Sequence, residues 1–242
     1  DNNLTSADGP VIVKDLFIDG NKDNNTGSAA GILLMTYQGK VEGCAIFKTT
    51  SHGIHFADQN KSGANVVGGQ QENKAFTNRI NQCNGSGIFT DDNAGSLTDL
   101  QVRGNVVGSC GGYGIITRAG SKVQSNHCYD LGLDGIAEQD GFDSLIEGNS
   151  IQDWGQDAAT GTRCGISVFG QGASRPTLVS SNNLRLSTLI VGSTYYAFRA
   201  TMAAGVTTAT GKVTFSGNEA RMNSNEYSLI ATGSGSATIS ML

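Results

Sequence analysis

The chain has 242 residues, a net charge of −5, and 34 glycines against only two prolines. The acidic balance excludes a typical nucleic-acid-binding protein, because such proteins neutralise phosphates with basic patches. The sequence has no run of about 20 apolar residues, the length that a transmembrane helix needs. We therefore expect neither nucleic acid nor membrane insertion, and the composition is too apolar for a disordered chain.

A short pattern recurs along the chain, in which an opening asparagine or cysteine is followed ten or more residues later by an isoleucine that directly follows a glycine. Its copies are residues 21–32, 44–54, 78–88, 105–115, 126–136 and 149–166. Each copy is typical of a short apolar strand, a Gly/Asn turn and a second short strand. Such a unit cannot bury its apolar face alone and must stack on its neighbours. The repeat therefore predicts an all-β fold, a parallel β-helix of about eight coils.

Taken in chain order, the first predicted strand covers residues 11–18, and the repeats follow it with little interruption up to residue 173. The period then loosens, although residues 177–190, 195–201, 212–218 and 227–230 still indicate strands. We expect one domain over residues 1–242, with regular coils at 10–173 and looser coils at 174–242. Because no capping element precedes the first strand, we expect the chain to be part of a longer polypeptide.

Two columns of residues should stack from coil to coil. The asparagines tolerate a left-handed bend, and their amides can bond the coils above and below. This ladder is predicted to hold Asn21, Asn78, Asn105, Asn126, Asn149, Asn182 and Asn218. Cys83 and Cys110 share a second repeat position and should be buried in adjacent coils. The five cysteines cannot all pair within the chain, and none has zinc-site spacing. We expect buried free thiols, no metal and no cofactor.

Several phrases identify a resemblance: Ile18-Asp-Gly-Asn21, Val102-Arg-Gly-Asn105 and Ile146-Glu-Gly-Asn149, together with the repeated Gly-Ile. They resemble the pectate-lyase-like right-handed parallel β-helix superfamily, over about residues 10–170. The resemblance implies a right-handed parallel β-helix and a polysaccharide substrate. That superfamily includes pectate lyases, polygalacturonases, alginate epimerases and phage tailspike depolymerases, and the fold alone does not choose among them.

The motifs of the enzymes in that superfamily are missing. The chain has no Asn-Thr-Asp, Gly-His-Gly or Arg-Ile-Lys set of polygalacturonases, no Tyr-Gly-Phe-Asp-Pro-His motif of alginate epimerases, and no clear calcium-binding Asp cluster of pectate lyases. These absences favour a tailspike-like protein. The resemblance then implies a homotrimer on a virion (phage tail) or another extracellular location. An outward apolar row of Leu33, Phe89 and Ile116 could form the subunit seam, or could stack on sugars.

Placing the Gly-Ile strands in register, with each isoleucine inward, gathers charged residues on one patch. The patch holds Asp91, Asp92, Arg118, Glu138 and Asp140, with His55 and Asp58 at its lower edge. Because coils are about 4.8 Å apart, Asp92 and Asp140 would lie roughly 10 Å apart, near the upper end of the range for inverting glycosidases.

We predict that this patch cleaves a glycosidic bond, with Glu138, Asp91, Asp92 and Asp140 as the catalytic residues. Glu138 is the better acid because burial favours the protonated form of a carboxyl group, and Asp91 or Asp92 is the base. Arg118 would hold an acidic sugar or orient a carboxylate. The predicted substrate-binding residues are Arg118, His55, Asp58 and Trp154.

Simpler interpretations remain open for each of these residues. The Asp91-Asp92 pair can be a solvated turn that Arg118 neutralises, and His55 and Trp154 can be packing residues. Three functions also remain open for the whole protein. It can be a depolymerase that hydrolyses bacterial surface glycan, a secreted lyase, hydrolase or epimerase acting on an acidic polysaccharide, or a non-catalytic spacer or carbohydrate-binding β-helix.

Overall fold

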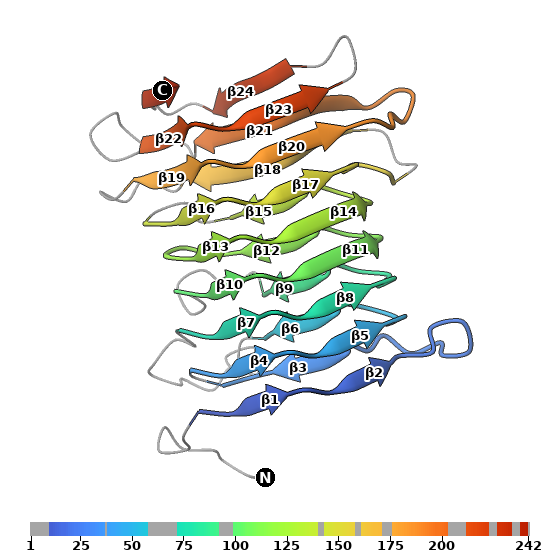
Figure 1. The fold of residues 1–242 in the computed structure, drawn as a ribbon. Helices are drawn as coiled ribbons and strands as arrows, with labels where there is room; N and C mark the ends of the chain where they lie inside the picture. Colours follow the sequence, from blue (N-terminus) through green and yellow to red (C-terminus); the bar gives the residue numbers. More distant parts are fainter. Residues whose placement is uncertain are drawn as a thin grey trace.

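The computed structural model describes residues 10–36, 38–57, 72–91, 99–139, 143–157, 161–170, 176–202, 212–222, 227–233 and 238–241. Within these ranges the regular structure consists of 25 β-strands in three parallel sheets (Figure 1). The strands run round an axis from sheet A to sheet B to sheet C and then begin the next coil. Eight coils of three strands follow one another in this way, and β25 comes after them.

Each sheet collects one strand from every coil. Sheet A contains β1 (Ile12–Lys14), β4 (Lys40–Glu42), β7 (Lys74–Phe76), β10 (Gln101–Arg103), β13 (Lys122–Gln124), β16 (Leu145–Glu147), β19 (Thr177–Ser180), β22 (Lys212–Ser216) and β25 (Thr238–Met241). Sheet B contains β2 (Phe17–Asp19), β5 (Ala45–Phe47), β8 (Arg79–Asn81), β11 (Val106–Cys110), β14 (His127–Leu131), β17 (Ser150–Gln152), β20 (Asn183–Leu186) and β23 (Glu219–Met222). Sheet C contains β3 (Ile32–Leu34), β6 (Ile54–Phe56), β9 (Ile88–Thr90), β12 (Ile115–Thr117), β15 (Ile136–Glu138), β18 (Thr162–Gly170), β21 (Thr194–Met202) and β24 (Tyr227–Gly233).

The register of sheet C is the one that the Gly-Ile repeat predicts. Ile54 pairs with Ile88, Ile115 pairs with both Ile88 and Ile136, and Ile136 pairs with Ile166. The predicted parallel β-helix of about eight coils is therefore confirmed. The strands after residue 174 continue the same three sheets rather than starting a new arrangement.

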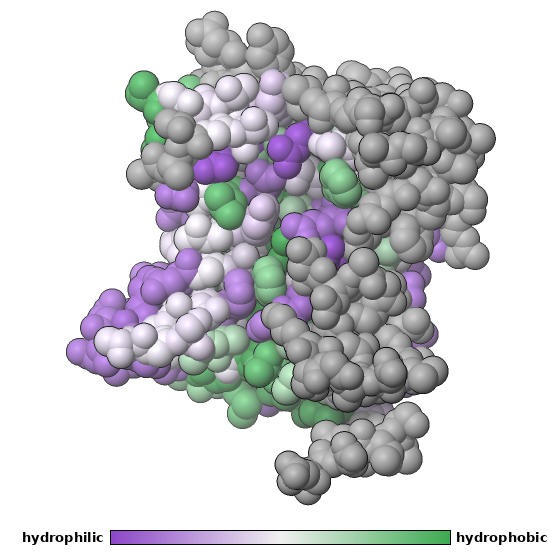
Figure 2. All heavy atoms as spheres, turned by 180° about the vertical axis from the view of Figure 1, so that it is seen from behind, coloured by the Kyte–Doolittle hydropathy of each residue, from purple (hydrophilic) through white to green (hydrophobic). Residues whose placement is uncertain are grey.

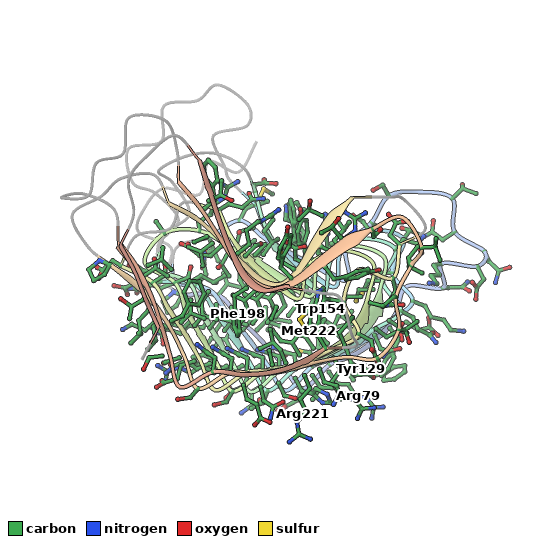
Figure 3. The ribbon with its side chains drawn as sticks, turned by 90° about the horizontal axis from the view of Figure 1, so that it is seen from above. Arg79, Tyr129, Trp154, Phe198, Arg221 and Met222 are labelled. Atoms are coloured by element: carbon green, nitrogen blue, oxygen red, sulfur yellow. The ribbon has the colours of Figure 1, made fainter. Side chains whose placement is uncertain are left out.

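The core follows from the alternation of side chains along each short strand. In most strands of sheets A and B the central residue points inward, as Val41 and Ile80 do. In the three-residue strands of sheet C the first and third residues point inward, as Ile54 and Phe56 do. Figure 3 looks down the axis and shows Trp154 between the sheets. The solenoid interior is thus a column of mostly apolar side chains.

The predicted asparagine ladder forms one corner of the solenoid, where sheet A gives way to sheet B. Each side-chain amide donates a hydrogen bond of 2.9 or 3.0 Å to the Oδ1 atom of the asparagine one coil later. The chain of donors and acceptors runs through Asn78, Asn105, Asn126, Asn149, Asn182 and Asn218. The same amides also donate to backbone carbonyls, so these buried polar groups are satisfied.

The prediction was wrong for Asn21. Ala45 donates its backbone N–H to the carbonyl of Leu16, as Arg79 does to Cys44, so Leu16 is the first-coil residue equivalent to Cys44. Asn21 lies beyond β2 in a turn, with a φ of 48°, and accepts a hydrogen bond from the Asn24 amide. The letters Gly20-Asn21 follow the sheet B strand there, whereas Gly104-Asn105 and Gly148-Asn149 precede theirs.

All five cysteines are buried and free, as predicted. Cys83 and Cys110 lie on neighbouring coils, since Gly111 donates its backbone N–H to the Cys83 carbonyl at 2.9 Å. Cys110 pairs in turn with Leu131. Among the described residues, no helix is long and apolar enough to span a membrane.

Candidate functional site

The candidate site lies on the outer face of sheet C, where the strands of the fourth to seventh coils surround a cavity of about 330 Å³. Its lining includes Tyr113, Arg118, Asp134, Glu138, Ser167 and Arg199. The long strands β18 and β21 bend toward the other two sheets, which makes the outer face of sheet C concave (Figure 3). Figure 2 views the molecule from this side and shows hydrophilic and hydrophobic side chains interspersed along it.

Asp134 is a buried carboxylate at this cavity, with an exposed fraction of 4%. The backbone N–H of Cys164 donates to its Oδ1 atom at 2.8 Å, and the Ser167 hydroxyl donates to Oδ2 at 2.7 Å. Arg199 lies 3.4 Å from the same Oδ2 atom. Burial raises the pKa of Asp134, although the bonds from Ser167 and Cys164 and the charge of Arg199 act in the opposite direction. The carboxyl group therefore keeps its proton to a higher pH than an exposed aspartate does.

Tyr113 is the neighbour of Asp134 on the preceding coil, since Gly114 donates its backbone N–H to the Asp134 carbonyl. Burial, and then the negative charge of Asp134, raise the pKa of the Tyr113 phenol. The phenol therefore remains a hydrogen-bond donor at neutral pH. It can bind a sugar hydroxyl or carboxylate but is a poor base.

Glu138 points inward from β15, as the register predicts, and has an exposed fraction of 1%. The Ser144 hydroxyl donates to its Oε1 atom at 2.9 Å, and Ser144 Oγ in turn accepts the backbone N–H of Ser121. These contacts hold the carboxyl group in one orientation beneath the cavity that it lines.

Asp91, just after β9 of the third coil, and His55, in β6 of the second coil, form a close pair. His55 Nε2 lies 2.9 Å from Asp91 Oδ1, and Arg118 donates from Nε to the Asp91 backbone carbonyl at 3.1 Å. Asp91 has an exposed fraction of only 3%, so it does not belong to a solvated turn. The structure thus brings together Asp91, His55 and Arg118, three of the residues that the sequence pointed to.

His52 and Phe89 complete this lower group. Their rings stack at 4.0 Å with an interplanar angle of 5°, and the backbone N–H of Ser86 donates to His52 Nδ1 at 3.0 Å. Burial, and then the charge of His55, lower the pKa of His52 to about 4. His52 is therefore neutral at physiological pH. Because Phe89 is covered by His52 and Ile116 is 2% exposed, only Leu33 of the predicted apolar row is widely open, at 54%.

The remaining predicted residues do not join this group. Asp58, Asp92 and Asp140 lie outside the described residues. Trp154 has an exposed fraction of 0% and lies inside the solenoid next to Leu131 in the column of Cys83 and Cys110. Trp154 is therefore a core packing residue and not a substrate-binding residue, because no part of its indole reaches the surface where a sugar could stack.

The sequence interpretation missed Asp134 and Arg199. Asp134 stands just before the Gly135-Ile136 pair. The sequence prediction considered only the positions after each isoleucine as outward-facing, so it did not include Asp134. A Cβ on Gly135 would meet the Ile151 side chain at 2.5 Å, so the glycine faces the core and the chain turns there. Asp134 consequently faces the cavity. Arg199 comes from β21, which pairs with β18 without a Gly-Ile signal.

Among the described residues, no group of three or more His, Cys, Asp or Glu side chains could hold a metal ion. The described side chains on the concave face of sheet C offer carboxyl, imidazole, phenol and guanidinium groups. Two carboxyl groups, Asp134 and Glu138, share one cavity with two arginines, Arg118 and Arg199. This arrangement suits general acid–base chemistry on a polyhydroxylated or acidic ligand.

The comparisons with known proteins agree with the architecture. A sequence family described as "Right handed beta helix region" matches residues 5–123. The Siphovirus 9NA tailspike receptor binding domain is 14% identical with a TM-score of 0.62, over 96% of this chain and 42% of that one. A structure titled "Glycoside hydrolase" is 10% identical with a TM-score of 0.52, over 88% and 37%. A double mutant of the periplasmic alginate epimerase AlgG is 14% identical with a TM-score of 0.49, over 96% and 51%.

The three stacked parallel sheets, the family match over residues 5–123 and the tailspike structure define the fold: the chain is a right-handed parallel β-helix. It spans less than half the length of the tailspike and glycoside hydrolase structures that it resembles. No curated protein matches it by sequence.

Proposed function

We propose that the chain binds and hydrolyses a bacterial surface polysaccharide, as a depolymerase of the phage tailspike type. The observation that carries the proposal is the pair of buried carboxyl groups, Asp134 and Glu138, at one cavity on the concave face of sheet C. Hydrolysis of a glycosidic bond uses two carboxyl groups in different protonation states. The similarity to tailspike and glycoside hydrolase structures supports the fold that such a site needs.

In the proposed reaction, Asp134 is the general acid, because its raised pKa favours the protonated form. It gives its proton to the glycosidic oxygen as the bond from that oxygen to the anomeric carbon breaks. Glu138, oriented by Ser144, takes a proton from the water that attacks the anomeric carbon. Arg118 and Tyr113 bind the sugars on either side.

The experiment is incubation with a panel of capsular and O-antigen polysaccharides, following new reducing ends and the ultraviolet absorbance of unsaturated sugars. Hydrolysis produces reducing ends without that absorbance. Asp134→Asn and Glu138→Gln should each abolish it, whereas Asp130→Asn, at an exposed position bonded to Ser109 beyond the cavity, should not. No cleavage of any glycan by the intact protein, with binding retained, would support a carbohydrate-binding β-helix instead.

A polysaccharide lyase is the second candidate, favoured by the His55–Asp91 pair beside Arg118. His55 would remove the proton next to a uronate carboxylate, Asp91 would orient the imidazole, and Arg118 would neutralise the carboxylate. Reducing ends that appear together with absorbance would identify this reaction. His55→Gln would then abolish it, and Asp134→Asn would have the smaller effect.

The assembly is part of the same proposal. A tailspike-type depolymerase acts outside the cell as a homotrimer on a virion, and the exposed Leu33 on the outer face of sheet C is a candidate contact between subunits. The mass of the protein in solution tests this point. A stable monomer would favour a secreted enzyme over a tailspike, and a trimer that Leu33→Ser dissociates would support the seam.

A further inference from the structure

A second pair of reactive groups lies at the corner between sheets B and C, away from the candidate site. Cys83 follows β8, and Cys110 ends β11. The two strands are in register, with Asn81 paired to Gly108, and Gly111 donates its backbone N–H to the Cys83 carbonyl. Cys83 and Cys110 therefore lie directly opposite each other. Neighbouring strands are about 4.8 Å apart, within the roughly 4.4–6.8 Å that a disulfide requires between Cα atoms.

The two thiols interact with each other. The adjacent Cys110 thiol lowers the pKa of Cys83, against the effect of burial, and the positive charge of Lys22 adds to this. The adjacent Cys83 thiol and burial raise the pKa of Cys110, whose own Sγ donates to the Gly108 carbonyl at 3.3 Å. One sulfur of the pair is thus the easier to ionise while its neighbour keeps its proton. Since the thiolate is the nucleophile, this asymmetry suits thiol oxidation.

The pair lies in the wall of a surface cavity, and the two cysteines themselves are 1% and 2% exposed. Both cysteines line a cavity of about 400 Å³ at the surface, together with Lys22, Asn84, Ser109 and Asp130. Cys128 provides a contrast, because its neighbours in register are Val107 and Ile151 and burial raises its pKa to about 12. Cys83 and Cys110 therefore lie beside each other at the wall of a cavity, whereas Cys128 has apolar neighbours in register on both sides.

We propose that Cys83 and Cys110 are a modification site, at which a disulfide bond joins the third and fourth coils when the folded protein meets a peroxide. The Cys83 thiolate attacks one oxygen of hydrogen peroxide, the O–O bond breaks, and a sulfenic acid and water result. The Cys110 sulfur then attacks Cys83, the S–O bond breaks, and a second water leaves. Two thiols are oxidised, and one peroxide is reduced to two waters.

The disulfide changes the mechanics of the solenoid rather than its chemistry. The third coil carries Asp91, which pairs with His55, and the fourth coil carries Arg118. A covalent link between these two coils therefore holds this part of the concave face together. The two coils can no longer separate when the chain unfolds. The proposal does not depend on the proposed function, because it concerns a different corner of the coil.

The test treats the folded, reduced protein with hydrogen peroxide and follows thiols and mass. Thiol titration should fall from the five free cysteines by two, the mass should fall by two hydrogen atoms, and a peptide map should contain a Cys83–Cys110 cross-link. Cys83→Ser and Cys110→Ser should each prevent the loss, whereas Cys128→Ser should not. The oxidised protein should also unfold at a higher denaturant concentration than the reduced protein, and this difference should vanish in Cys83→Ser.

The peptide map of the unaltered protein keeps the proposal falsifiable if a serine variant does not fold. Cross-links between other cysteines, a sulfenic or sulfinic acid at Cys83 without a cross-link, or oxidation that begins only in denaturant would each overturn it.

Discussion

The Ser167 hydroxyl donates a 2.7 Å hydrogen bond to Asp134 Oδ2, and it does so from the next coil of the solenoid. The carboxyl group is thus held by a residue far along the chain, while burial still raises its pKa. A group in this state is less stable as an anion than it would be in water. Such a cost to the fold is commonly found at functional sites.

The first prediction concerns the pH dependence of stability. Because the pKa of Asp134 is raised by folding, the folded state binds the proton more tightly, and stability falls as pH rises from the usual aspartate pKa through the raised one. Asp134→Asn should remove this fall, so its denaturant midpoint relative to wild type should improve with increasing pH. Denaturant titrations at several pH values between 3 and 8 measure this (about 1.4 kcal/mol per pKa unit). Parallel curves for the two proteins would contradict it.

The second prediction concerns acid. Folding lowers the pKa of His52 from 6.5 to about 4, so the folded state binds its proton less tightly. The stability linked to this neutral imidazole is present above pH 6.5 and is lost as pH falls toward 4, by roughly 2 kcal/mol after allowance for partial exposure. His52→Asn, whose side-chain oxygen can still accept from Ser86 N–H, should lose less stability over this window. Equal losses in both proteins would show that another group dominates.

The third prediction concerns the asparagine ladder. Asn105→Ala removes the acceptor of the Asn78 amide and the donor to the Ala75 carbonyl. Because these groups are buried, the change should cost about 3 kcal/mol or more. Asn183, exposed on the outer face of sheet B, is the matched control and should tolerate alanine within roughly 0.5 kcal/mol. Unfolding midpoints of the two variants test the difference, which would disappear if water satisfied the orphaned groups.

The fourth prediction concerns a glycine of the repeat. A Cβ on Gly87 would lie 2.1 Å from Val107 Cγ1 and 2.8 Å from the Gly114 carbonyl oxygen. Gly87→Ala should therefore force neighbouring coils apart and destabilise the fold by about 1–3 kcal/mol. Gly27→Ala is the control, since its Cβ meets only the Asn25 side chain at 3.4 Å. Thermal unfolding of both variants provides the comparison, and equal effects would argue against close packing at the glycine.

The sequence predicted the fold well because the repeat itself encodes the register. The spacing from Asn105 to Ile115 places a corner, a core strand and a turn in every coil. Equivalent coils then stack, and their strands form the three sheets in register. It failed at Asn21, where the same letters occupy a turn after the strand. A sequence motif therefore identifies a corner position only if the strand of sheet B begins directly after it.

The site was predicted only in part, for a physical reason. Alternation along the strand correctly turned Glu138 inward and set Arg118 beside Asp91. It could not show that Gly135 lies close against Ile151 of another strand, or that Asp134 before it lines the cavity. Arg199 carried no signal at all, since its strand lacks the repeat.

The asparagine ladder has a consequence for how this protein can change. Its rungs are separated by 27, 21, 23, 33 and 36 residues, yet every amide meets the next at nearly the same distance. The ladder therefore keeps the register of the strands constant although the number of residues per coil varies. A connection can therefore gain or lose residues while the sheets stay aligned. Insertions and deletions in these connections can alter the rims of the concave face without rebuilding the solenoid that supports it.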